Sequence, residues 1–173
     1  MPVLAVISGY QGCGKTHLCT SLQATYGHLV CFKDVDAFLP FDGFKDRLDS
    51  FIEECKMPLV LFGTFCDDAT KEEPYFPEAE HYIWMDVEIM KSIKQALQRQ
   101  LDAIESGANL CDFLIRKSSS SAKNWINAYL NPHMQFQEGI YQAIRCCGFT
   151  RMAPELIESF ILKASNNSST REQ

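Results

Sequence analysis

The sequence predicts an α/β protein in which a five-stranded parallel sheet carries helices on both faces. Short apolar runs that suit buried strands alternate with longer segments whose apolar residues recur every three or four positions, as on one face of a helix. This strand–helix alternation occurs five times along the chain. Such an order builds a parallel sheet through crossover helices. A glycine-rich motif also lies between the first predicted strand and the first predicted helix, at residues 9–16.

The predicted strands are short and mostly apolar, and we place them at Val3–Ile7, Leu29–Lys33, Leu59–Phe62, His81–Met85 and Phe149–Met152. The predicted helices follow from apolar spacing and from terminal glycine and proline signals. They comprise the segment after the motif that carries Leu18 and Leu22, then Phe44–Cys55, Ile89–Ile104, two short helices at Trp125–Leu130 and Ile140–Ile144, and a last helix that starts at Pro154.

The motif Gly9-Tyr10-Gln11-Gly12-Cys13-Gly14-Lys15-Thr16 fits the phosphate-binding pattern G-x-x-x-x-G-K-[ST]. Glycines allow positive φ angles and a close approach of backbone N–H groups to phosphate oxygens. The first turn of the following helix offers unpaired N–H groups and a positive dipole end. A glycine-rich turn before an ordinary helix is the alternative. The pattern favours a nucleotide site made of Gly9, Gln11, Gly12, Cys13, Gly14, Lys15, Thr16 and His17.

Within this motif, Lys15 is expected to reach the β- and γ-phosphates, and the Thr16 hydroxyl is expected to hold Mg²⁺. Cys13 has two interpretations. It is either a reactive thiol, because a helix N-terminus lowers a thiol pKa, or one tolerated residue at a variable loop position.

Two carboxylates, Asp34 and Asp36, follow the second predicted strand. If the strand is still extended there, the two side chains point the same way at its carboxyl end, where ligands bind in open α/β sheets. One carboxylate could hold Mg²⁺ through water while the other acts as general base or anchors a substrate hydroxyl. Solvated turn acids or a helix cap are the alternative.

Composition limits the classes of function. The chain has 173 residues and a net charge of −6, which suits one domain without an extensive nucleic-acid surface. Its eight cysteines have no metal-ligand spacing, so reduced, partly buried thiols are expected. We find no signal peptide and no apolar run long enough for a membrane span, so a cytoplasmic location is expected.

We expect one domain over residues 1–165, with a small helical lid at about 107–132 and a disordered polar tail at 166–173. The lid prediction comes from Arg116 and Lys117, which precede four consecutive serines. A flexible segment with cations can close over a transferring phosphoryl group. A solvated linker is the alternative.

The order of elements with the motif first resembles the P-loop kinases of small molecules, which include nucleoside, nucleotide, shikimate and gluconate kinases. Further likenesses are the acidic pair Asp34-Val35-Asp36, a glycine rather than an acid after the third strand (Gly63), Met85-Asp86-Val87 before a basic helix, and Met152-Ala153-Pro154 before the last helix.

The resemblance implies a three-layer P-loop NTPase fold that binds ATP and Mg²⁺. It implies that Lys15 and Thr16 bind phosphate and metal, that Asp34 acts on the metal side, and that Asp36 acts on the acceptor hydroxyl. Among the remaining residues, it implies that Arg99, Arg116 and Lys117 are lid cations, with Arg116 counted among the catalytic residues, and that Arg151 and Pro154 lie near the adenine.

The function that follows is ATP-dependent phosphoryl transfer to a small acceptor, with nucleosides and nucleotides favoured. An ATP-binding regulatory or scaffold protein without kinase activity is the alternative. Phosphorylation of a polynucleotide 5′ end is a third possible function, but the negative net charge of the chain argues against it. The sequence lacks the N-K-x-D signal of guanine recognition, which argues against a GTP switch. It predicts no oligomeric state.

Overall fold

The computed structural model describes residues 3–10, 12–38, 43–63, 65, 75–88, 91–92, 94–95, 98 and 148–169. Within this part of the chain, the elements with full bounds are β1 (Val3–Ser8), α1 (Lys15–Tyr26), β2 (Cys31–Asp34), the 3₁₀ helix η1 (Val35–Phe38), α2 (Phe44–Glu54), β3 (Leu59–Phe62), β4 (Ala79–Met85), β5 (Thr150–Met152) and α6 (Pro154–Ser169).

The strands form one sheet in the order β2–β3–β1–β4–β5, and every neighbouring pair is parallel. The prediction of a five-stranded parallel sheet is therefore confirmed. Strand β1 lies in the centre and is buried along its whole length. Because all strands run the same way, the segments that follow them gather at a single edge of the sheet, their carboxyl edge.

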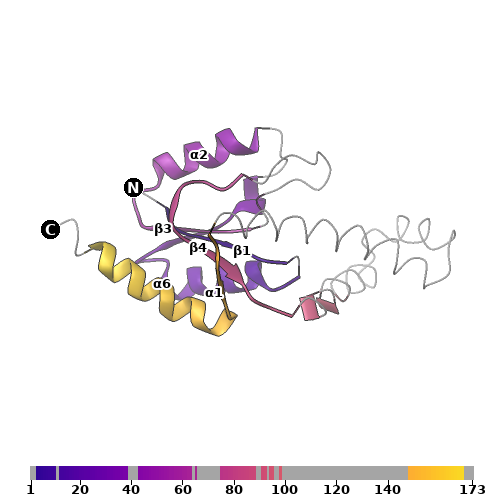
Figure 1. The fold of residues 1–173 in the computed structure, drawn as a ribbon. Helices are drawn as coiled ribbons and strands as arrows, with labels where there is room; N and C mark the ends of the chain where they lie inside the picture. Colours follow the sequence, from indigo (N-terminus) through magenta and orange to yellow (C-terminus); the bar gives the residue numbers. More distant parts are fainter. Residues whose placement is uncertain are drawn as a thin grey trace.

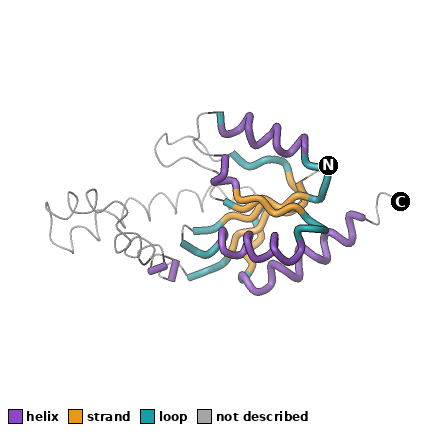
Figure 2. Tube along the Cα trace, turned by 180° about the vertical axis from the view of Figure 1, so that it is seen from behind, coloured by secondary structure: helices purple, strands orange, loops and turns teal. Residues whose placement is uncertain are grey.

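Helices cover both faces of the sheet, as predicted (Figure 1). Helices α1 and α6 lie on one face, where Leu22 and Ile157 pack with Leu4 of β1. Helix α2 lies on the other face, where Leu48 packs with Val6 and Leu61. The view from behind shows the same three layers, with α2 separated from α1 and α6 by the strands (Figure 2).

The predicted bounds of β3 agree with the structure, and those of α2 agree within one residue. Strand β2 begins at Cys31 rather than Leu29, because the N–H groups of Leu29 and Val30 both donate to the Tyr26 carbonyl and extend the turn after α1. Helix α6 continues to Ser169, so the predicted start of a disordered tail at residue 166 falls inside a helix.

Most of the segment between β4 and β5 lies outside the described residues. At the start of the predicted helix Ile89–Ile104, the Ser92 N–H donates to the Glu88 carbonyl over 3.0 Å, which is one helical turn. The two short helices predicted at Trp125–Leu130 and Ile140–Ile144, and the lid at about 107–132, lie outside the described part of the chain.

Candidate phosphate-binding site

The loop between β1 and α1 has the backbone shape that requires glycine. Gly12 has φ 83° and Gly14 has φ 98°, both in the left-handed region that side chains with a Cβ avoid. The Cys13 N–H donates to the Tyr10 carbonyl over 3.1 Å and closes a turn that contains Gly12. Gln11 lies outside the described residues.

Gly9, the first glycine of the motif, is needed for a different reason. A Cβ at this position would lie 3.0 Å from Cys13 Sγ and 3.2 Å from the Met85 carbonyl oxygen. Both approaches are tighter than ordinary van der Waals contact. Glycine therefore lets the start of the loop lie against the end of β4. Cys13 itself is buried, at 5% exposure, and belongs to the core beneath α1.

Lys15 is the first residue of α1, and its side chain folds back over the loop. Its Nζ donates to the Gly9 carbonyl over 2.7 Å and to the Tyr10 carbonyl over 3.0 Å, and it lies 3.8 Å from Cys13 Sγ. The residue is only 8% exposed. A buried ammonium needs such partners, because desolvating a charge without hydrogen bonds is costly. The loop thus holds a positive charge directly against its own backbone.

The N-terminus of α1 points out of this loop. Gly14 is the N-cap, and as glycine it offers no capping side chain to the first helical N–H groups. Thr16 and His17 are exposed in this first turn. Unpaired N–H groups and the positive end of the helix dipole together favour an anion. The backbone, Lys15 and the helix end therefore concentrate positive potential at one point of the carboxyl edge.

The acidic pair lies at the same edge, but its geometry differs from the expectation. Asp34 is the last residue of β2, and the chain then turns into η1, so Asp36 is not on an extended strand. The Asp36 N–H donates to Asp34 Oδ1 over 3.0 Å. This side-chain-to-backbone bond competes with strand extension and starts the turn. The condition for two parallel side chains, an extended strand through Asp36, is therefore not met, and the bond from the Asp36 N–H to Asp34 is the turn or helix-cap arrangement that was the alternative.

The electrostatic environment of Asp36 links it to the loop. Desolvation by neighbouring atoms is the main cause that raises the pKa of its carboxyl, and the nearby Asp34 carboxylate raises it further. The Lys15 ammonium acts in the opposite direction and lowers this pKa. Lys15 and Asp36 therefore lie close enough to interact electrostatically.

Two residues connect the loop to the acidic turn. The Ser8 hydroxyl, at the end of β1, donates to the Gly63 carbonyl over 3.0 Å in a fully buried position. Gly63, directly after β3, has no room for a Cβ, because that atom would lie 2.0 Å from Val35 Cγ2. Sequence reasoning noted Gly63 but missed Ser8. The available signal was a hydroxyl residue at the end of an otherwise apolar buried strand.

The other half of the edge is formed by β4 and β5. The connection from β1 leads to β2 and the connection from β4 leads to β5, in opposite directions along the strand order, so β1 and β4 flank the switch point at which ligands bind in open α/β sheets. Here the Tyr10 ring meets the Trp84 ring edge-on, with centroids 5.1 Å apart. Asp86, just after β4, forms an exposed ion pair with Arg151 of β5, and Pro154 opens α6. Arg151 and Pro154 thus lie at the carboxyl edge, two strands away from β1.

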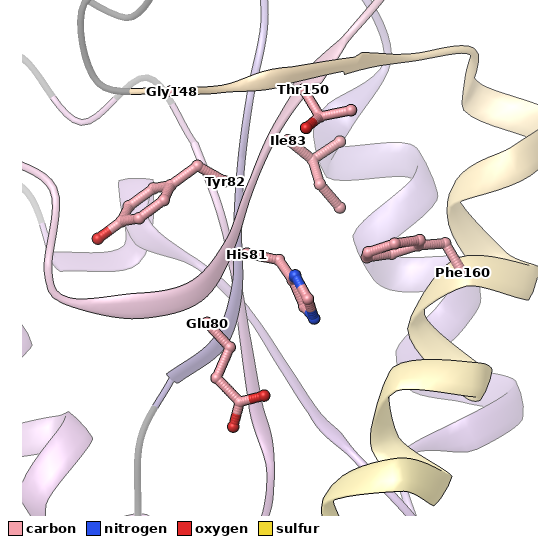
Figure 3. A pocket seen from close by; sticks show the side chains of 7 residues that line it. All are labelled: Glu80, His81, Tyr82, Ile83, Gly148, Thr150 and Phe160. Carbon is pink, nitrogen blue, oxygen red and sulfur yellow. The ribbon is translucent and has the colours of Figure 1, made fainter.

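A separate hollow of about 230 Å³ lies beside β4, β5 and α6 rather than at the loop between β1 and α1 (Figure 3). His81 and Phe160 face each other in it, with ring centroids 5.0 Å apart, while Tyr82 points to the other side of β4. In the sheet register His81 is level with Ala5, three residues before the end of β1. No residue of the motif at residues 9–16 lines this hollow.

Several predicted site residues lie outside the described part of the chain, namely Gln11, Arg99, Arg116 and Lys117. Among the described residues, no group of three or more His, Cys, Asp or Glu side chains is arranged to hold a metal ion. Mg²⁺ in nucleotide sites is held by one or two protein oxygens together with substrate phosphates. Thr16 and Asp34 fit that chemistry only in combination with a nucleotide.

The helices that the structure describes include none with the length and apolar character needed to cross a membrane. No protein-family model matches the sequence, and no curated protein matches it significantly. The functional interpretation therefore depends on the motif and on the geometry described above.

Proposed function

We propose that the protein is a kinase of the P-loop class, which transfers the γ-phosphoryl group of ATP to a small-molecule acceptor. The observation that carries the proposal is the juxtaposition at the carboxyl edge of the sheet. A glycine loop with two positive φ angles and a buried lysine lies next to an acidic turn whose Asp36 is within electrostatic reach of that lysine. Phosphoryl transfer needs a phosphate-binding cation and an acceptor-orienting acid side by side.

In this proposal the loop N–H groups and Lys15 bind the β- and γ-phosphates of ATP. Lys15 exchanges its hydrogen bonds with the Gly9 and Tyr10 carbonyls for bonds to phosphate oxygens. Such charge-assisted bonds are stronger than bonds between neutral groups. Thr16 and Asp34 would hold Mg²⁺, which neutralises charge on the phosphates when it is bound.

Asp36 has the acceptor role. A carboxyl with a raised pKa is a better proton acceptor than an ordinary one, and Asp36 has this property through desolvation and the neighbouring Asp34. It would accept the proton of the acceptor hydroxyl or orient that hydroxyl toward the γ-phosphorus. Nucleosides and nucleotides are the favoured acceptors because the chain resembles kinases of that kind.

The test is ADP release from Mg·ATP by the purified protein, with nucleosides, nucleoside monophosphates, sugar acids and small alcohols added one at a time. We expect one class to stimulate release many-fold. Lys15→Met is the control for contaminating activity and should be silent, since methionine keeps the apolar stem but removes the charge. Asp36→Asn should bind ATP but lose stimulated transfer.

A result without stimulation overturns the kinase proposal. If ATP binds to the wild type and not to Lys15→Met, yet no acceptor increases turnover, the ATP-binding regulatory or scaffold function replaces it. If ATP does not bind at all, the loop is a glycine-rich turn and both functions are excluded.

A further inference from the structure

The end of β1 is joined to the end of β3 by two hydrogen bonds. The Ser8 hydroxyl donates to the Gly63 carbonyl over 3.0 Å, and the Gly63 N–H donates to the Ile7 carbonyl over 3.1 Å. Ser8 is fully buried and immediately precedes Gly9, the first residue of the phosphate loop. The position of Gly63 is therefore set by the strand that carries the loop.

Gly63 in turn contacts the acidic turn. A Cβ built on Gly63 would lie 2.0 Å from Val35 Cγ2, 3.3 Å from Val35 Cβ and 3.6 Å from Asp36 Oδ1. The glycine Cα thus touches the residue that precedes Asp36. Val35 is 1% exposed and packs in the core under α2 with Leu61 and Phe65.

We propose that Ser8 and Gly63 are positioning residues that set where Asp36 stands relative to Lys15. The proposal deepens the kinase function and rests on it, since the pair Lys15 and Asp36 is where phosphate and acceptor would meet. The route is short. Ser8 is hydrogen-bonded to Gly63, Gly63 packs against Val35, and Val35 directly precedes Asp36 in the chain.

This route transmits displacement because it is close-packed. Protein interiors have few voids, so an added methyl group forces Val35 into a strained rotamer and shifts its backbone. The Asp36 N–H is bonded to Asp34 Oδ1, so a shift of the backbone at Asp36 also disturbs its contact with Asp34. A small misplacement of a group that orients a reactant lowers the rate of the chemical step, even when substrate binding is intact.

Gly63→Ala is the first test. The added methyl collides with Val35 and displaces Asp36, while the loop glycines and Lys15 stay in place. We expect kcat for acceptor-stimulated transfer to fall about 10- to 100-fold. Affinity for ATP should be unchanged. Ser8→Ala removes the hydroxyl without adding bulk, and we expect a smaller loss of kcat in the same direction.

A compensating substitution distinguishes positioning from general damage. Val35→Ala deletes the Cγ2 atom responsible for the 2.0 Å approach and leaves Val35 Cβ at 3.3 Å. We therefore expect Val35→Ala/Gly63→Ala to recover most of the kcat lost in Gly63→Ala, although Val35→Ala alone destabilises the core. A double variant that is no more active than Gly63→Ala, with both folded by circular dichroism, would overturn the proposal.

A second measurement does not depend on catalysis. The backbone amide signal of Asp36 in a ¹H–¹⁵N correlation spectrum reports the turn directly. We expect it to shift in Gly63→Ala and to return toward its wild-type position in the double variant. An unmoved signal in Gly63→Ala refutes the positioning role. The two proposals can also be separated. If the signal shifts in Gly63→Ala and returns in the double variant, but the wild type transfers no phosphoryl group, the geometric link is supported and the kinase function is refuted.

Discussion

Asp36 interacts electrostatically with two charged residues of the candidate site, Lys15 of the loop and Asp34 of the acidic turn. Its side chain is exposed in the turn η1, yet its pKa is raised, first by desolvation and then by Asp34, against the opposing effect of Lys15. Like charges on neighbouring carboxyls make each harder to ionise. The native protein therefore holds the Asp36 proton more tightly than the unfolded chain does.

This raised pKa predicts how the stability effect of Asp36→Asn changes with pH. Protonated Asp36 contributes stability below the ordinary carboxyl pKa, and this contribution is lost as pH rises through the raised pKa of the folded state. The neutral amide does not titrate. The Tm of Asp36→Asn relative to wild type should therefore be higher at pH 7 than at pH 3.5, by a small amount because the side chain is exposed.

Thermal unfolding of both proteins at the two pH values measures this effect. Glu53→Gln, at an exposed position of α2, is the control for the general effect of removing one negative charge. The Tm of Asp36→Asn minus the Tm of wild type is the quantity compared. If this difference is the same at both pH values, or is larger at pH 3.5 than at pH 7, the described environment of Asp36 is contradicted.

Cys19 provides a second prediction for a single residue. It is 5% exposed on α1, and burial is the main cause that raises its pKa to about 12, with Asp34 and Cys31 adding to the effect. Only the thiolate reacts rapidly with alkylating reagents. In the native protein at pH 8, we expect Cys19 to be alkylated far more slowly than in the denatured protein, as measured by peptide mass spectrometry. Equal rates in the two states would contradict the burial of this thiol.

Two glycines with positive φ allow the effect of backbone strain on stability to be separated from its effect on ATP binding. At Gly14 a Cβ would meet only Met85 Cε, at 3.8 Å, so the methyl group fits and the strain comes from φ 98°. Gly148 is a matched position with φ 76° and nothing within 4 Å of a Cβ, before β5. A left-handed backbone costs an L-residue about 1–2 kcal/mol.

We therefore expect Gly14→Ala and Gly148→Ala to lower the free energy of unfolding by similar amounts, about 1–2 kcal/mol each. Only Gly14→Ala should weaken ATP binding, because only Gly14 shapes the loop. Urea unfolding and ATP titration of both variants measure the two effects. Equal ATP affinity in Gly14→Ala and wild type would show that this loop backbone is not needed for the nucleotide.

At the level of elements, the sequence predicts well where local signals agree. Helix α2 has a strong apolar stripe and stops before Met57-Pro58, and β3 is a compact apolar run, so both were predicted closely. The sequence left the geometry of Asp34 and Asp36 open between an extended strand and a turn or helix cap, because the outcome depends on a single hydrogen bond between the two residues. Ser8 was missed because its role depends on Gly63, a residue 55 positions away.

For the whole molecule, the alternation of strands and helices predicts the parallel sheet and its two covered faces. It does not predict the order β2–β3–β1–β4–β5, because a crossover helix can lead to an adjacent strand or past one. That order is what brings the loop after β1 beside Gly63 and, across β3, beside the acidic turn after β2. The motif was therefore visible in the sequence, whereas its partners depend on the fold.

The whole fold should respond to the nucleotide if the loop binds it. A ligand that binds only the folded state adds about 2.7 kcal/mol of stability at a concentration of 100 times its Kd. For a chain of this size, 1 kcal/mol shifts Tm by roughly 2–4 °C. Saturating Mg·ATP should thus raise the Tm of the wild type by about 5–10 °C.

Lys15→Met should lose most of this shift while keeping a cooperative transition, since the Lys15 ammonium is held by the loop and not by the rest of the core. Gly63→Ala should keep the shift, because its methyl group disturbs the acidic turn and not the phosphate loop. Differential scanning fluorimetry on the three proteins, with and without Mg·ATP, measures both effects. An equal shift in wild type and Lys15→Met would mean that ATP binds elsewhere on the molecule, and the loop would then lose its proposed role.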